Sequence, residues 1–336
     1  MISTPYTVLI KGQDFTSRFR PLIKSITIKR TATGAFDTAD FIIADPYGQV
    51  AFPQDRDPIE VSIRGAWAFS GFVSDPGWKF DKESGREITI SADSVDPGGK
   101  AKEQQLRNKD DATLKQVATE WGGKVGLSVQ FAGNVGEEFR GYWVQQNESF
   151  MSWGHRIAKE VGATFKIIGN RAFFTERNVG LSASGQSLTP LVAAGGVNLI
   201  SADIRPNVGR PKYKEVEVSY YDIAKGKRLS VKVPTGIDNV DAIMRKVMSS
   251  ATKDQAEKEA KSAAKESDRN RAEGTLEVLG FTGIEPETDV FLSGCRPGID
   301  GTYRADDVTL KLTKGAGFTA SVSIRHPQDG AGVDTR

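Results

Sequence analysis

Few side chains in this sequence have the types and spacing that catalysis or metal binding requires. Its histidines and its single cysteine are His155, His326 and Cys295. Zinc sites usually draw pairs of such ligands from positions only a few residues apart, and these three are far apart in the chain. We therefore expect no metal site. We expect His155, beside the apolar stripe of a predicted helix, to have a structural role.

Three short motifs could serve acid–base chemistry, phosphate binding or nucleophilic catalysis, but each departs from the required pattern. Asp306 and Asp307 are adjacent in a predicted strand, where neighbours point to opposite faces, so we expect a solvated strand entry. The glycine pair at 98–99 followed by Lys100 lacks the rest of a phosphate-binding loop, and we interpret it as a domain boundary. Ser184 replaces the second glycine of a hydrolase elbow at 180–184.

These departures predict no catalytic, cofactor-binding or metal-binding residues and no cofactor. A structural or binding role fits this sequence better than an enzymatic one. Catalysis by residues that are distant in the sequence is left open.

Composition excludes further classes of protein. The 336 residues are enough for two or three domains. Lysine and arginine total 45 against 43 acidic residues, a formal charge of +2, which gives no electrostatic footprint for DNA binding. One cysteine excludes an internal disulfide framework and fits a reducing cytoplasm. The first residues lack a signal-peptide pattern and no apolar run approaches a membrane span, so we expect a soluble product without membrane insertion.

Short alternating strands separated by turn residues fill about the first hundred positions. Residues 59–63 alternate isoleucine and valine with glutamate and serine, and a turn at Gly65 leads into the strand 67–74. Regular short strands of this kind indicate a barrel or a sandwich. Trp67 and Phe69 are expected to share a face of their strand, and we expect both in the core rather than on a binding surface.

Two helix–strand units follow. The first helix covers about 111–122, with Asp110 or Asp111 as its cap and Gly122 as its end, and a strand follows at 127–131. The second begins after Asn147, its predicted N-cap, and carries an apolar stripe of Phe150, Trp153, Ile157 and Val161. Gly162 ends this helix, and the period then changes to that of a hairpin over 165–175.

The last third of the chain is again dominated by strands. A hairpin is predicted over 215–233, and further strands over 276–278, 290–292, 308–312 and 318–324. Between them, residues 252–273 predict one helix rich in alanine, lysine and glutamate. Thr252 and Gln255 have capping-box spacing there, and Ala256, Ala260 and Ala263 lie on one face.

The second helix–strand unit also carries a resemblance. The motif Q-x-N-E-S-F at 145–150, followed by R-I-A-x-E-x-G-A-x-F at 156–165, resembles the signature of contractile-tail baseplate hub proteins. These are the phage late control D family and, more remotely, the VgrG-type tip proteins of type VI secretion. Residues 59–75 are similar to the first tube-like domain of that family, and G-x-Y-R at 301–304 with K-x-x-G-F-T at 314–319 to its end.

The resemblance implies a β-rich α+β fold with two tube-like antiparallel β-barrel domains. The first would cover 1–100 and the second 197–336, including the helix 252–273. An α+β middle domain with two helix–strand units would cover 101–196. Three chains would form a homotrimeric ring whose six barrels match a sixfold tail tube.

The implied function is that of a structural baseplate hub in the tail of a contractile-tailed phage (a myophage), prophage or derived particle. Its partners would be the central spike protein, the tail tube or tube-initiator protein, the baseplate wedge proteins and the tape measure protein. During DNA ejection, DNA would pass through the channel without sequence-specific binding. The expected location is the virion tail baseplate, assembled in the host bacterial cytoplasm.

Two alternatives stay open. One is a hub or tip component of a type VI or extracellular injection system, although the spike repeats of VgrG-type proteins are missing and a separate spike protein is expected. The other is a tail-associated hydrolase that cuts the cell wall.

Overall fold

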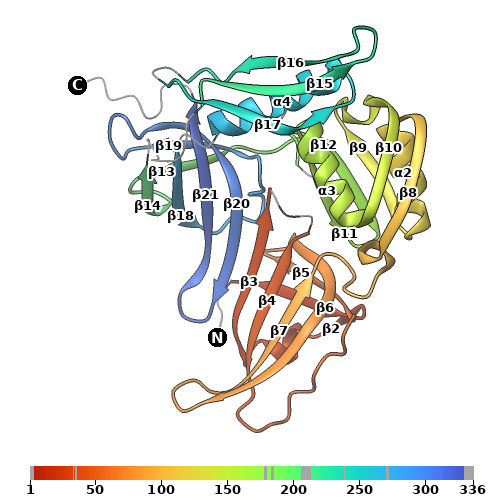
Figure 1. The fold of residues 1–336 in the computed structure, drawn as a ribbon. Helices are drawn as coiled ribbons and strands as arrows, with labels where there is room; N and C mark the ends of the chain where they lie inside the picture. Colours follow the sequence, from red (N-terminus) through yellow and green to blue (C-terminus); the bar gives the residue numbers. More distant parts are fainter. Residues whose placement is uncertain are drawn as a thin grey trace.

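The structure is a computed structural model that describes residues 4–32, 34, 36–177, 180–182, 185–205, 213–237, 240–269 and 272–328, without the side chains of 247–249 and 326–328. Its largest element is a 13-stranded, mainly antiparallel sheet, and helices are few (Figure 1). The predicted β-rich α+β fold class is confirmed. Within the described ranges, no helix combines the length and apolar character needed to cross a membrane.

The first half of the large sheet comes from the N-terminal part of the chain, here called the N-terminal block. Its strands follow the order β3-β4-β7-β6-β5-β1-β2, and a single-turn helix, α1, covers part of β1. The alternation of buried and exposed positions along each strand gives the block an apolar inner face. The elements are β1 (Tyr6–Ile10), β2 (Gln13–Asp14), α1 (Thr16–Phe19), β3 (Ile23–Thr31), β4 (Thr38–Ala44), β5 (Pro58–Ile63), β6 (Ala66–Asp81) and β7 (Gly85–Asp93).

The second half, the C-terminal block, comes from the last part of the chain and from residues just before position 200. β14, β18, β21 and β20 follow one another in the sheet, and β19 and β13 continue from β20. The elements are β13 (Leu191–Ala194), β14 (Leu199–Arg205), β18 (Glu273–Leu279), β19 (Asp289–Ser293), β20 (Gly301–Thr313) and β21 (Gly317–Gln328).

One strand pair joins the two blocks. β3 pairs antiparallel with β20, from Ser25 opposite Thr313 to Thr31 opposite Asp307. The buried side chains of both blocks consequently form one continuous cluster, which includes Ile26 and Ile28 of β3 and Leu310 and Leu312 of β20. The two β regions predicted as separate barrels therefore share a sheet and a core, while the division of the chain into domains at 100 and 196 stays a prediction.

The middle of the chain forms a second unit with its own core. Its two small sheets are β8–β10 and β11–β12–β9, and helices α2 and α3 pack against them (Figure 1). Trp121, Trp143, Trp153, Phe150 and Phe165 are fully buried there, in tilted or edge-to-face contacts. The elements are η1 (Lys100–Lys102), β8 (Gln104–Thr113), α2 (Leu114–Lys124), β9 (Ser128–Ala132), η2 (Val135–Glu137), β10 (Phe139–Ser149), α3 (Phe150–Val161), β11 (Ala163–Ile168) and β12 (Arg171–Glu176).

A third, smaller unit consists of one sheet and the alanine-rich helix. The strands β15 (Glu215–Asp222), β16 (Lys227–Pro234) and β17 (Ile243–Ser250) form the sheet, and α4 (Lys253–Arg269) packs on it through Ala256, Ala260 and Ala264. The predicted hairpin and the Thr252–Gln255 capping contact are confirmed. α4 is shorter than the predicted 252–273, because β18 begins at Glu273 and pairs with β14 and β21.

Two predicted helix caps are wrong. Ser149 caps α3 by accepting a hydrogen bond from the Ser152 amide, and Thr113 caps α2 in a capping box with Gln116. The predicted caps Asn147 and Asp111 instead lie in the preceding strands with positive φ, at 51° and 43°, in the small left-handed region that these residue types tolerate. The predicted end of α3 is confirmed, with Gly162 left-handed.

The prediction for Trp67 is also wrong. Phe69 is buried, but Trp67 is 46% exposed. The pairing of β5 with β6 shifts register between Val61 and Ser62, so Ala68 and Phe69 both become buried and the alternation expected from the sequence is broken.

We predict that Gly154→Ala destabilises the protein. A Cβ at Gly154 would lie 2.6 Å from the ring of Phe165, so overpacking should lower the free energy of unfolding by about 1–3 kcal/mol in chemical denaturation. Gly123→Ala in α2 is the matched control, because a Cβ there meets nothing within 4 Å and alanine favours helix. Equal effects of the two substitutions would contradict the packing described for α3.

Candidate functional site: the junction cavities

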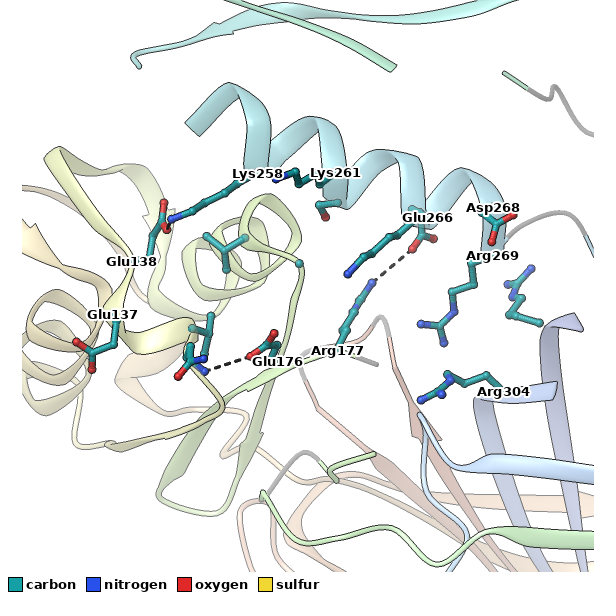
Figure 2. Close-up of a pocket in the computed structure, with 17 residues that line it drawn as sticks. Glu137, Glu138, Glu176, Arg177, Lys258, Lys261, Glu266, Asp268, Arg269 and Arg304 are labelled. Atoms are coloured by element: carbon teal, nitrogen blue, oxygen red, sulfur yellow. Dashed lines mark hydrogen bonds and ion pairs between the residues drawn. The ribbon is translucent and has the colours of Figure 1, made fainter. Parts of the chain in front are cut away.

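The larger cavity, here called the α4 cavity, lies where the middle unit, α4 and the C-terminal block meet (Figure 2). It has a volume of about 750 Å³. Its walls come from η2, the ends of α3 and β12, one face of α4, and the strands β20 and β21. Charged side chains from η2, the end of β12, α4, β20 and β21 line it.

On one side of the α4 cavity, ion pairs tie α4 to the middle unit. Lys258 reaches from α4 to the buried carboxylate of Glu138, and Arg177, after β12, lies 3.5 Å from Glu266 (Figure 2). The Ser262 hydroxyl of α4 also donates to the carbonyl of Lys159 in α3, at 2.9 Å. These contacts hold the helix in place rather than leave charges free for a ligand.

On the other side, the last turn of α4 is bound to the large sheet. Arg269 donates to Glu287 at 2.7 Å and to Asp306 at 3.3 Å, and Asp306 also accepts from Arg325 at 2.7 Å. Burial opposes the charge of Arg269, but Glu287 and Asp306 outweigh it and raise the pKa of this guanidinium. Arg304 of β20 pairs with Asp289 at 2.8 Å. The arginines of this wall are thus engaged with carboxylates of the same chain.

A second cavity of about 350 Å³, the Arg30 cavity, lies between the N-terminal block, the hairpin β11–β12 and the loop before β19. Arg30 of β3 is buried and donates to three backbone carbonyls, those of Ala68 at 2.7 Å, Thr282 at 2.8 Å and Ile284 at 2.9 Å. Its guanidinium also lies 5.2 Å from the ring centre of Trp67. Arg30 therefore connects both blocks of the sheet at one point.

A buried ion pair connects the N-terminal block to the middle unit at the same cavity. Lys166 of β11 donates to Asp37, and both residues are buried. Beside them the Ser94 hydroxyl accepts from the Asp37 amide at 3.0 Å and donates to the Ile167 carbonyl at 2.7 Å. Burying two such charges costs desolvation free energy, and the cost is largest if either charge loses its partner. The ion pair therefore fixes the relative position of the two units.

Glu285 also lines the Arg30 cavity. Burial raises the pKa of its carboxyl above the ordinary value, and the nearby Arg30 guanidinium partly opposes this rise. The cavity therefore holds a carboxyl whose ionisation is disfavoured, beside an arginine and a lysine that are already bound to other groups.

The residues singled out from the sequence do not come together. His155 lies half-buried on α3, and burial, Arg177 and Lys159 lower its pKa. Cys295 is exposed, and the side chain of His326 lies outside the described part. Ser184 lies outside it as well. Among the described residues, no group of histidine, cysteine and acidic side chains could hold a metal ion.

The interpretation of the acidic pair at 306–307 as a solvated strand entry is wrong for Asp306. β20 shifts register between Ala305 and Val308, and Asp306 is buried against Arg269 and Arg325. No signal beside Asp306 in the sequence identifies these partners, because they lie on two other elements, 37 and 19 positions away along the chain.

The signature motif at 145–165 has a structural explanation. Gln145 is fully buried and its amide donates to the Glu148 carbonyl at 2.8 Å. Arg156 binds the Glu148 carboxylate, the Val144 carbonyl at 3.1 Å and Glu160 at 3.1 Å. The motif therefore fixes the bulged end of β10 against α3.

The fold has counterparts among solved structures. A 43 kDa tail protein of prophage MuSo2 from Shewanella oneidensis aligns over 97% of this chain and 99% of its own length, with a TM-score of 0.75 and 18% identity. A tail protein from Neisseria meningitidis aligns over 98% and 97%, with a TM-score of 0.71 and 16% identity. The chain has the fold of phage tail proteins.

A more remote counterpart extends this tail-protein fold to secretion systems. An Escherichia coli protein, described as a type VI secretion component with structural similarity to T4 tail proteins gp27 and gp5, aligns over 96% of this chain and 77% of its own. Its TM-score is 0.58 at 9% identity. These neighbours agree with the resemblance to baseplate hub and VgrG-type proteins. No family model and no curated protein matches the sequence.

We predict that Lys166→Met is strongly destabilising. The change leaves Asp37 buried without its cation, which should lower the free energy of unfolding by about 3–5 kcal/mol. Lys253→Met removes an exposed pair with Glu257 and should change it by no more than about 0.5 kcal/mol. Urea denaturation of both variants measures the difference, and a small effect at Lys166 would show that the junction does not depend on this pair.

We predict that Glu285→Gln alters the pH dependence of stability. The folded protein holds a proton on Glu285 at higher pH than the unfolded chain does, so this carboxyl makes the free energy of unfolding fall as pH rises from about its ordinary pKa of 4.5 through its raised value. Relative to the wild type, Glu285→Gln should gain stability over that window. Denaturant titrations of both proteins from acid to neutral pH test this. A relative loss of stability with rising pH would contradict the direction of the shift.

Proposed function

We propose that this chain is the baseplate hub of a contractile tail and that three copies form a ring between the sixfold tail tube and the threefold central spike. The observation that carries the proposal is the continuous sheet through β3 and β20, which holds two β blocks in one chain. Three copies would present six blocks around an axis. Such a ring can contact a sixfold tube on one side and a threefold spike on the other.

The balance of charge supports a channel through this ring. The outer face of the sheet around the β3–β20 pair carries hydroxyl side chains such as Thr27, Thr309 and Ser321, with Lys29 and Lys311 interspersed. Lys29 and Lys311 are attractive contacts for phosphate groups, and Asp40 of β4, which pairs with Thr27, offsets part of their charge. DNA and a tape measure protein could therefore pass without being held tightly. The partners of the hub would be the tape measure protein and the DNA that pass through it, the spike, the tube or its initiator, and the wedge proteins.

We propose further that the role is structural rather than enzymatic. Several charged groups of the α4 cavity and the Arg30 cavity bind other parts of the chain, as in Arg269 with Glu287 and Lys166 with Asp37. Assembly would take place in the host bacterial cytoplasm and the product would reside in the virion tail.

A second candidate, a hub in a type VI or extracellular injection system, has support from the similarity to the Escherichia coli secretion component.

We predict that the purified chain, mixed with the spike protein of the same tail, gives a complex of three hub chains and one spike trimer. Native mass spectrometry measures this stoichiometry directly. Lys166→Met should reduce the yield of the complex, because it disturbs the junction between units, whereas Lys253→Met should not. A complex with two or six hub chains, or no binding of the spike, would contradict the proposed role.

A further inference from the structure

One face of α4 is basic and lines the α4 cavity. Four residues recur on it at spacings of three or four positions: Lys258, Lys261, Lys265 and Arg269. That spacing places the four side chains on one side of the helix. All four line the cavity, whereas the alanine face of α4 packs on the sheet β15–β17. The basic face is therefore turned toward the junction of the units.

The two ends of this basic face are bound to other parts of the chain, but its middle is not. Lys258 pairs with a carboxylate of the middle unit, and Arg269 pairs with carboxylates beside the large sheet. Lys261 and Lys265, between them, are exposed and form no ion pair with any residue that the structure describes. α4 thus crosses the cavity with two unpaired cations in the middle of its span.

The wall opposite α4 is also basic. Arg304 of β20 and Arg325 of β21 line the cavity, and Figure 2 shows Arg269 reaching from α4 toward the strand that carries Arg304. Asp289 and Asp306, which hold these two strand arginines, are not part of the lining. A guanidinium has five N–H donors, and a carboxylate uses only some of them. The arginines are therefore positioned from outside the cavity and still present positive charge to it.

The acidic residues of the lining do not neutralise this charge. Seven lysines and arginines line the cavity against five acidic residues. Glu266 already lies 3.5 Å from Arg177, Glu176 accepts from a backbone amide at 3.1 Å, and Asp268 also has a partner. Glu137 lies at the opposite end of the cavity from the arginine wall (Figure 2). An excess of positive charge consequently remains between the middle of α4 and the strands.

We propose that the α4 cavity binds a small anion with two or more phosphate groups. Its volume of about 750 Å³ lies within the range of small-molecule sites. Guanidinium and ammonium groups bind phosphate oxygens through strong, charge-assisted hydrogen bonds. The cations approach from α4 on one side and from β20 and β21 on the other, so they match tetrahedral groups, whose oxygens point in several directions, better than a planar carboxylate.

Such a ligand would link α4 to the large sheet and add to the ion pairs at the two ends of the helix. It would stabilise the junction of the units and take part in no reaction. The site is independent of the proposed hub role, because it depends only on side chains within one copy of the chain.

Calorimetric titration of the full chain with sodium pyrophosphate at low ionic strength tests the site. We expect saturable binding at one site per chain. Lys265→Gln should weaken it by roughly tenfold, because one charged hydrogen-bond donor is lost. Lys253→Gln, at an exposed lysine of the same helix outside the cavity lining, is the matched control and should leave the affinity unchanged. Both variants should keep the wild-type melting temperature in the absence of ligand, because both side chains are exposed.

A second variant should act in the opposite direction. Glu266→Gln removes a negative charge from the lining and releases Arg177, so pyrophosphate should bind more tightly. A purely structural role of the charged residues does not predict such a gain. Pyrophosphate should also raise the melting temperature of the wild type, since it binds only the folded chain, and should raise that of Lys265→Gln less.

The outcomes that would overturn the proposal are distinct. Equal weakening in Lys265→Gln and Lys253→Gln would show non-specific attraction to a basic helix. Weaker binding by Glu266→Gln would show that the cavity does not attract anions. Citrate that binds as tightly as pyrophosphate would overturn the assignment to phosphate groups. Neither heat of binding nor a change in melting temperature at millimolar pyrophosphate would show that the cavity is no anion site.

Discussion

The pairing of β3 with β20 is the constraint on which the rest of the structure depends. These strands come from opposite ends of the chain, and their seven residue pairs convert two β blocks into one sheet with one core. Because hydrogen bonds and buried side chains cross the join, the blocks cannot move independently without breaking the sheet. Arg30 reinforces the join by binding carbonyls of both blocks. The middle unit and α4 then attach to this rigid body through buried ion pairs.

Local patterns in the sequence predicted much of this structure. Gly162 ends α3 in the left-handed conformation, Phe150 is buried, and the strands of the hairpin β15–β16 alternate as predicted. These features could be predicted because each depends on neighbours within a few residues. The errors came from strand irregularities. Asn147, Asp111 and Trp67 lie at or near bulges or positive φ values, which no simple periodicity reveals. The joining of the two blocks depends on contacts nearly 300 positions apart in the chain, beyond any local signal.

At the candidate site, too, contacts between distant parts of the chain could not be predicted from the sequence. Lys166 alternates with Phe165 and Ile167, a pattern of a strand with one solvated face, yet it is buried against Asp37 from a different unit. Asp306 was expected in solvent and instead accepts from two arginines. In both cases a charged residue marks a junction between units. The sequence motif that resembles hub proteins is explained in the same way, since Arg156 and Glu148 hold α3 against the bulged strand.

The central claim is that one rigid chain contributes two β blocks to a threefold wall around a channel. Electron cryo-microscopy of the chain assembled with its spike and tube tests this most directly. We expect three copies around one axis, with the β3–β20 pair intact in each and six β blocks forming the wall. A twofold assembly, or a wall to which each chain gives a single block, would contradict the account.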